Sequence, residues 1–281
     1  MKNDEYWQKK EQLTQLAKIH TRYMFQHYSK ETQESELKSI IYSAGSARST
    51  TTSCIPSLIK VQDIDTVSAI FAYASQNKKK ICVLNFASYK NPGGKFIEGS
   101  SAQEESLCHE SNLYNVLIRF KDTWYSKHNQ PGATNHSLYE DEALYTPNII
   151  FKRGSQVVEA DVLTCAAPNW TAANKYSHES IERNNYILKN RIKFIKGIME
   201  EQKVDIAVLG AYGCGVFGQD PAIVASYFNE IFTNTTISSL VYAVPKGKGM
   251  NASTNFDTFK SIIKERDPDD EISTPSARIL I

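Results

Sequence analysis

The chain has 281 residues, of which 41% are hydrophobic and 11% aromatic, enough for one large domain or two small ones with a substantial core. Its 32 basic and 31 acidic residues give a formal net charge of +1, which excludes the broad basic surface of a generic nucleic-acid-binding or acidic-membrane-binding protein. No apolar run approaches the roughly 20 residues that span a bilayer, and the opening MKNDEYWQKK lacks the apolar core of a signal peptide. The five scattered cysteines indicate reduced thiols. We therefore expect a cytosolic protein, either in its own cell or delivered to a host cytosol.

Both ends of the chain are expected to lie outside the main domain. Residues 1–55 are predicted to form a helical extension: an amphipathic helix over residues 4–30 packs on the main domain, and the Ser/Thr-rich segment 43–53 forms a loop. Residues 267–281 carry charges and two prolines and leave little to bury, which is typical of a loosely held tail. The main domain is therefore assigned to residues 56–266.

Helices and strands alternate in this main domain. TVSAIFAYAS (66–75) has helical spacing, and the continuous apolar run ICVLNFA (81–87) indicates a buried strand. Alternation of this kind predicts a three-layer α/β fold, in which a mixed, mostly parallel sheet lies between helices. The later predicted elements are a helix at 101–120, an irregular excursion at 121–160, a strand at 161–167, a helix at 178–202, a strand at 205–211, a helix at 220–232, a strand at 238–244 and a helix at 254–265.

The segment NPGGKFIEGSSAQEE follows the buried strand and places a glycine pair ahead of two carboxylates. Gly93 and Gly94 allow close approach of the backbone to a ligand. A helix N-terminus then presents Glu104 and Glu105 at the carboxyl end of the strand, where ligands of open α/β sheets bind. The alternative reading is structural, because Ser101 and Glu104 also form an S-x-x-E capping box that would open the helix.

The segment LGAYGCGVFGQDPAIVASYF predicts a strand, a glycine loop and then a helix capped by Asp220. Its Gly213, Gly215 and Gly218 match a dinucleotide fingerprint, but the next strand ends without the acid that would bind a ribose, so a dehydrogenase is poorly supported. The N–H groups of such a loop can hold a pyrophosphate beside a helix N-terminus, and a plain tight turn is the alternative. Cys214 lacks the flanking glycines of a nucleophile elbow. The histidines show no paired spacing, so neither a metal nor a cofactor is predicted.

Four segments together resemble one known family. VLNFASYKNPGG, GSSAQEESLC, AAPN and GAYGCGVFGQDP are similar, in this order, to the motifs of microbial-type poly(ADP-ribose) glycohydrolases, a branch of the macrodomain fold. The family signature of three glycines, a spacer of about seven residues and Gln-Glu-Glu falls on Gly93, Gly94 and position 95, then on Gln103 to Glu105. The third glycine is Lys95 here. Its N–H remains available to a phosphate, while its side chain either adds a cation to the pyrophosphate site or narrows the pocket.

The resemblance, which extends roughly over residues 60–260, implies a macrodomain-like fold and an ADP-ribosyl glycohydrolase. It makes Glu105 the catalytic acid, while Glu104 holds the ribose next to the scissile bond and Phe217 lies against that ribose. A single carboxyl group can protonate the leaving oxygen and then activate a water. The alternative is a non-catalytic module that recognises ADP-ribose, with Lys95 as the reason for lost turnover.

The resemblance also sets the expected ligands. Poly(ADP-ribose) or protein-linked ADP-ribose is the expected substrate, ADP-ribosylated proteins are expected partners, and the protein is expected to act as a monomer. The loop at 213–217 is expected to cover the pyrophosphate. The residues predicted to bind the substrate are Gly93, Gly94, Lys95, Gln103, Gly213, Cys214, Gly215, Val216, Phe217 and, for the adenine, Asp65.

Overall fold

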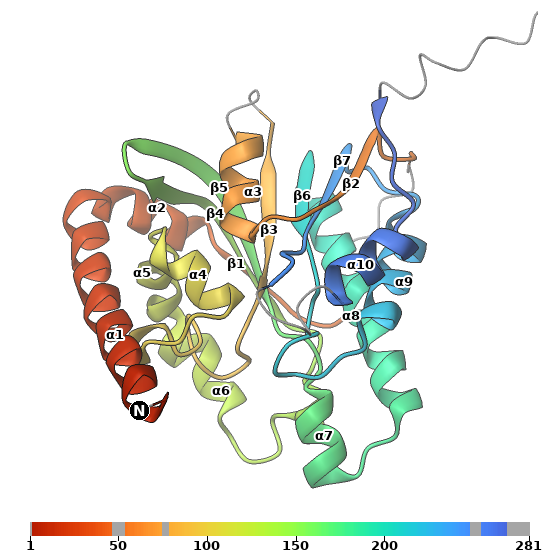
Figure 1. Cartoon of the computed structure of the whole chain (residues 1–281), viewed down its shortest axis with the longest axis horizontal. Helices are drawn as coiled ribbons and strands as arrows, with labels where there is room; N and C mark the ends of the chain where they lie inside the picture. Colours follow the sequence, from red (N-terminus) through yellow and green to blue (C-terminus); the bar gives the residue numbers. More distant parts are fainter. Residues whose placement is uncertain (1, 47–53, 75–78, 248–253, 269–281) are drawn as a thin grey trace, which may run out of the picture.

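The computed structural model of the chain describes residues 2–46, 54–74, 79–247 and 254–268. Seven strands form one sheet in the order β1-β4-β5-β3-β6-β7-β2 (Figure 1). The five strands from β5 to β2 in this order are parallel, and the pairs β1/β4 and β4/β5 are antiparallel. The predicted mixed, mostly parallel sheet is therefore confirmed. The strands are β1 (Ile40–Tyr42), β2 (Leu58–Gln62), β3 (Ile81–Phe86), β4 (Ala143–Arg153), β5 (Gln156–Cys165), β6 (Ile206–Leu209) and β7 (Ser239–Ala243).

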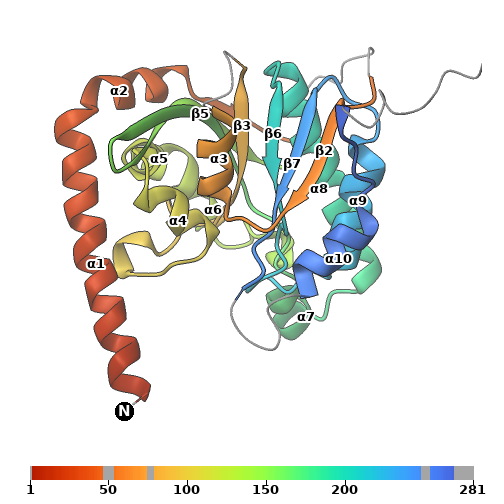
Figure 2. The same cartoon turned by 45° about the horizontal axis from the view of Figure 1, so that its top comes forward.

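Helices cover both faces of the sheet (Figure 2). The central strand β3 alternates between two cores: Ile81 and Val83 pack with α3 and α4, and Cys82 and Leu84 pack with α8 and α9. A strand with both faces covered reads as one continuous apolar run, which is why its prediction from the sequence is confirmed. The principal helices are α1 (Lys2–His27), α2 (Ser29–Lys38), α3 (Thr66–Ala74), α4 (Gln103–His109), α5 (Leu113–Leu117), α6 (Ser126–His128), α7 (Trp170–Ser177), α8 (Ile181–Glu201), α9 (Pro221–Phe232) and α10 (Thr254–Ile262).

The irregular excursion predicted at 121–160 is wrong over its second half, where β4 and β5 form a long antiparallel hairpin. Arg153 pairs with Gln156, so the loop contains only Gly154 and Ser155, and Gly154 takes the positive φ of +59° that such a turn requires. A shift of register between Thr146 and Ile149 interrupts the strand pattern of β4. The glycine-serine pair was the available signal for this hairpin.

The single helix predicted at 101–120 is also wrong, because it divides into α4 and α5. Between them, Ser111 forms a bridge with Phe151 of β4. Asn112 donates its backbone N–H to Ile150 O at 3.1 Å and accepts from Ile150 N at 2.9 Å through Oδ1. Hydrogen bonds to the outer part of β4 therefore replace those of a continuous helix.

Several shorter elements were missed by sequence analysis. α2, β1, β2 and α7 were not predicted, and α8 begins at Ile181 after the N-cap Ser180 rather than at 178. β1 pairs with β4, so part of the predicted N-terminal extension contributes an edge strand, and the boundary at residue 55 stays a prediction. Most of the loop predicted at 43–53 and of the tail predicted at 267–281 lies outside the described residues.

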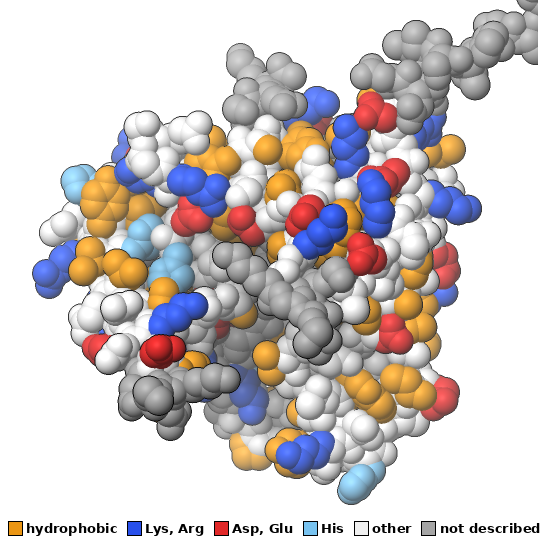
Figure 3. Space-filling view, in the orientation of Figure 1, with side chains coloured by type: hydrophobic (Ala, Val, Ile, Leu, Met, Phe, Trp, Pro, Cys, Tyr) orange, Lys and Arg blue, Asp and Glu red, His pale blue; other side chains and the backbone are white. Residues whose placement is uncertain are grey.

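The surface and the cysteines carry few special features. All five cysteines are free thiols. Among the described helices, none combines the length and apolarity needed to cross a bilayer. On the face drawn in Figure 3, basic and acidic side chains are interspersed. This face therefore presents no extended basic surface to an anionic ligand.

Candidate active site

A cavity of about 460 Å³ lies at the carboxyl ends of β3, β5 and β6, where the two glycine-rich segments meet. It collects most of the residues singled out from the sequence. Gly93, Cys214 and Asp65 are the predicted site residues that do not line it. Those that do are Gly94, Lys95, Gln103, Glu104, Glu105, Gly213, Gly215, Val216 and Phe217.

The glycine pair makes room for the neighbouring side chains. Gly93 and Gly94 have φ values of +67° and +61°, in the left-handed region that favours glycine. A Cβ atom at Gly94 would lie 2.6 Å from Oε1 of Glu105 and 3.0 Å from Oε2 of Glu104. At Gly93 it would lie 2.8 Å from the ring of Tyr114. The missing side chain at Gly94 is thus what lets both carboxylates reach this loop.

Glu104 is buried, with 3% of its surface exposed. Its Oε2 accepts from the backbone N–H of Ser88 at 2.7 Å, and its Oε1 accepts from Nδ2 of Asn85 at 3.2 Å. Burial raises the pKa of Glu104 to about 8, although these hydrogen bonds act in the opposite direction. Burial therefore favours the protonated form of Glu104.

Glu105 is held differently, because its Oε1 accepts the backbone N–H of Lys95 at 2.9 Å. This corrects the expectation that the Lys95 N–H is available to a phosphate, since the catalytic candidate itself occupies that donor. The Lys95 side chain is exposed, and its Nζ lies 3.9 Å from Oε2 of the equally exposed Glu98. Lys95 therefore orients Glu105 through its backbone and leaves its cation at the rim of the cavity.

The capping box, which was the alternative reading of this segment, is not formed. α4 begins after Ala102, which makes no side-chain cap, and Glu104 points to the end of β3 instead of back to its own helix. Gln103 joins α4 to β3 with both ends of its amide: Oε1 accepts from Phe86 N at 2.8 Å, and Nε2 donates to Leu84 O at 3.0 Å. These contacts fix the register of the helix that carries the two glutamates.

The second glycine loop lies opposite the carboxylates. Among the described residues, the N–H groups of Gly215, Val216 and Phe217 have no acceptor. A Cβ atom at Gly215 would meet nothing within 4 Å, so this part of the loop borders open space. Burial raises the pKa of the Cys214 thiol to about 12, which suits a packed loop residue rather than a nucleophile. Asp220 caps α9 as predicted, accepting from Ala222 N at 2.7 Å.

An aromatic wall, of which sequence analysis singled out Phe217 but not Tyr89, lines one side of the cavity. Tyr89 and Tyr139 line the cavity, and their rings stack with centroids 4.3 Å apart. The other face of Tyr89 stacks on His128 at 4.0 Å, and Tyr139 meets Phe217 edge-on at 6.1 Å. These residues come from separate segments of the chain, so no local sequence pattern predicts the wall.

Asp65, the candidate for the adenine, caps α3. Its Oδ1 accepts from the backbone N–H of Ser68 at 2.9 Å, and its Oδ2 accepts from the Ser68 hydroxyl at 2.6 Å. Hydrogen bonds from Ser68 and the nearby Arg153 cation lower the pKa of Asp65, although burial, the largest single influence, raises it. An adenine contact at Asp65 stays a prediction.

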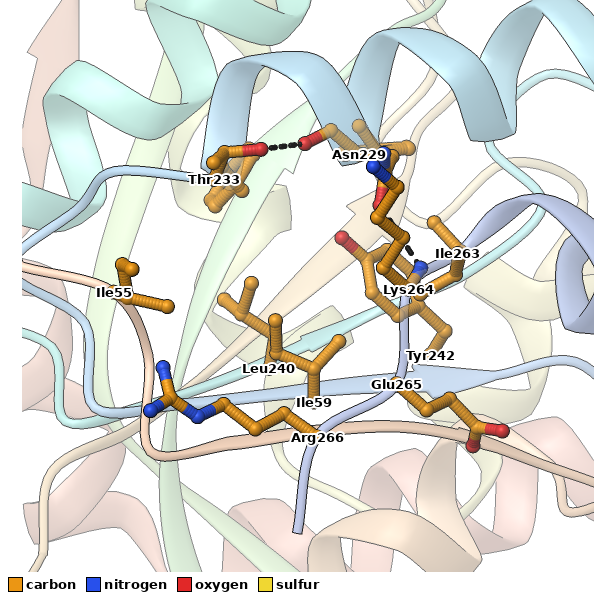
Figure 4. Close-up of a pocket in the computed structure, with 12 residues that line it drawn as sticks. Ile55, Ile59, Asn229, Thr233, Leu240, Tyr242, Ile263, Lys264, Glu265 and Arg266 are labelled. Carbon is orange, nitrogen blue, oxygen red and sulfur yellow. Dashed lines mark hydrogen bonds between the residues drawn. The ribbon is translucent and has the colours of Figure 1, made fainter. Parts of the chain in front are cut away.

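A second, smaller cavity of about 230 Å³ lies between α9, β7, β2 and the end of α10 (Figure 4). Its lining includes apolar side chains such as Leu240 and Tyr242. Asn229 Oδ1 accepts the backbone N–H of Lys264 at 3.0 Å, and the Glu265 carboxylate accepts a backbone N–H of β2. The polar groups here stabilise the fold, so the first cavity is the better candidate for chemistry.

Comparison with known proteins gives the same fold. A family model described as the catalytic domain of microbial-type PARG matches residues 2–154. Poly(ADP-ribose) glycohydrolase (PARG) from Thermomonospora curvata is 23% identical, with a TM-score of 0.80 over 90% of this chain and 100% of that chain. PARG from Deinococcus radiodurans in complex with ADP-ribose is 25% identical, with a TM-score of 0.71 over 82% of this chain and 96% of that chain. A search of curated proteins finds no match. The predicted macrodomain-like fold is thus supported.

Proposed function

Because the chain belongs to the family of microbial-type poly(ADP-ribose) glycohydrolase catalytic domains, we propose that it hydrolyses the glycosidic bond of poly(ADP-ribose) or of protein-linked ADP-ribose in the cavity at the ends of β3, β5 and β6. One observation carries this proposal. The carboxylates of Glu104 and Glu105 converge on Gly94 at the wall of a cavity large enough for a nucleotide sugar.

The second glycine loop supports binding of the pyrophosphate. The three N–H groups from Gly215 to Phe217, which have no acceptor in the part of the chain that the structure describes, lie next to the segment that leads into α9. Backbone N–H groups near a helix N-terminus bind phosphate without a cationic side chain. This is the type of site needed by a protein with nearly balanced charge.

The chemistry assigns the two glutamates separate tasks. Cleavage at an anomeric carbon passes through an oxocarbenium-like state, which requires a proton for the leaving oxygen and then an activated water. Glu105 gives its proton to the leaving oxygen, and its carboxylate then takes a proton from the water that attacks the anomeric carbon. The products are free ADP-ribose and a leaving group with a new hydroxyl. Glu104, whose protonated form is favoured by burial, holds the ribose through a hydroxyl group.

Glu104 is the second candidate for the acid, because its raised pKa also gives it a transferable proton. Adjacent residues of a helix point about 100° apart, so the two carboxyl groups do not flank one bond as in a two-carboxylate glycosidase. Matched Glu104→Gln and Glu105→Gln variants separate the roles. The acid variant should lose turnover and keep ADP-ribose affinity, whereas the ribose-holding variant should lose affinity as well.

The experiment that tests the function is incubation of the protein with poly(ADP-ribose) and, separately, with a mono-ADP-ribosylated protein, followed by measurement of free ADP-ribose. Release from the polymer alone identifies a glycohydrolase, and release from the mono-modified protein identifies a de-modifying enzyme. ADP-ribose binding without release from either substrate would contradict hydrolysis and favour the non-catalytic module.

A further inference from the structure

The loop beside the cavity has unusual backbone geometry. Between Asn135 and Tyr139, every residue except Leu138 is in the left-handed region although none is glycine. The φ values are 44° at Asn135, 54° at His136, 70° at Ser137 and 61° at Tyr139. Such conformations cost stability and persist only where the surroundings over-determine them, and they cluster at binding and catalytic sites.

α8 supplies the group that holds this loop. Arg191 has no exposed surface, and its guanidinium donates in three directions. Nε donates to Oδ1 of Asp141 at 2.5 Å, Nη2 donates to the carbonyl oxygen of Tyr139 at 3.1 Å, and Nη1 donates to the carbonyl oxygen of Ala166. Arg191 therefore ties the strained loop to the segment that follows β5.

The ring of Tyr139 lies in the wall of the same cavity as Glu104 and Glu105. It lines the cavity and packs with Tyr89 and Ala166 in a small buried cluster. Tyr89 directly follows Ser88, whose N–H holds Glu104. Phe217 meets Tyr139 at an interplanar angle of 61°, so the two rings form an aromatic corner in the wall of the cavity that also contains Glu104 and Glu105.

We propose that Tyr139 contacts the ribose whose glycosidic bond is cleaved and that it forms one side of a corner completed by Phe217. This inference rests on the proposed function, which puts that ribose beside Glu104 and Glu105. An aromatic ring held without conformational freedom packs against the apolar face of a sugar and directs its anomeric carbon. The hydrogen bond from Arg191 to the carbonyl oxygen of Tyr139 holds the backbone that carries this ring.

The test compares two ligands by calorimetry. ADP shares the adenosine and the pyrophosphate of ADP-ribose but lacks the second ribose. Only the affinity for ADP-ribose should therefore depend on contact with the aromatic corner. Tyr139→Asn removes the ring and suits a left-handed backbone, and Tyr139→Leu is a second variant that keeps an apolar side chain. Both should bind ADP-ribose about tenfold more weakly and ADP as tightly as the wild type does.

Ser137→Gly is the matched control, because it relieves strain in the same loop without removing a ring. It should keep both affinities and the melting temperature. An equal loss of affinity for both ligands in the Tyr139 variants, or no loss of affinity for either ligand, would overturn the inference. If the wild type releases ADP-ribose from the polymer and the Tyr139 variants bind ADP-ribose as tightly as the wild type does, this inference alone is refuted. A wild type that binds no ADP-ribose refutes the proposed function with it.

Discussion

Gly94→Ala tests the contact on which the site is built. Because Gly94 has a φ of +61° and its Cβ would lie 2.6 Å from Oε1 of Glu105, the substitution acts on the backbone and on the carboxylate together. Ordinary van der Waals contact begins at 3.4 Å, so the carboxylate must retreat by about 0.8 Å. A misplacement of about 1 Å costs roughly 10²-fold in rate, and the retreat also weakens the hydrogen bond from Lys95.

The matched control is Gly154→Ala. Gly154 has a φ of +59°, and nothing lies within 4 Å of its Cβ position, so this variant carries the same backbone strain without the contact. Left-handed alanine costs about 1–2 kcal/mol, and both variants should therefore lower the melting temperature by about 2–4 °C per kcal/mol. Only Gly94→Ala should lose turnover, by on the order of 10²-fold in kcat for release of ADP-ribose. Equal kcat values in the two variants would refute the reasoning.

Three further predictions address the groups around the cavity. Burial raises the pKa of Glu104 to about 8, so the folded state holds a proton that the unfolded state releases above its pKa of 4.5. The free energy of unfolding should therefore fall by several kcal/mol as pH rises from 4.5 to 8. Urea unfolding at pH 5 and 9 should show this decrease in the free energy of unfolding in the wild type. The same decrease in a Glu104→Gln variant would contradict the prediction. Gly215→Val should abolish ADP-ribose binding at an unchanged melting temperature, because its side chain enters open space; unchanged calorimetric affinity removes this loop from the site. Lys95→Gly keeps the backbone N–H, so it should preserve kcat. Because it removes the Lys95 cation, it should weaken ADP-ribose binding and reduce the dependence of that binding on salt. Binding curves of the wild type and the variant that coincide at both low and high salt would show that the cation does not reach the ligand.

Elements whose signals are local were predictable from the sequence. The buried strand at Ile81–Phe86 is a continuous apolar run, and α9 begins with the cap Asp220 followed by Pro221. Both patterns extend over only a few residues, and the structure contains the strand and the capped helix that they predict. The two glycine-rich segments were also recognisable, because a strand that ends in a glycine loop before a helix is typical of a ligand site in an α/β chain.

Features that depend on distant partners were not predictable. Glu104 reads locally as half of a capping box, but the N–H of Ser88 offers it a tertiary partner, and the cap is not formed. Tyr139 lies in the segment predicted to be an irregular excursion, and its contacts with Arg191 and Tyr89, both distant in the sequence, hold it at the cavity. The engagement of the Lys95 N–H by Glu105 has the same cause, since nothing in the spacing of the two residues specifies it.

The central claim is that Glu105 carries the proton transfers while the surrounding groups position the substrate. The most direct measurement is the single-turnover rate of ADP-ribose release from poly(ADP-ribose) by Glu105→Gln, together with its calorimetric affinity for ADP-ribose. Loss of general acid–base help costs on the order of 10² to 10⁴ in rate, so release should fall by at least 10²-fold while affinity stays within about threefold of the wild type. Release at the wild-type rate by Glu105→Gln would contradict the assignment.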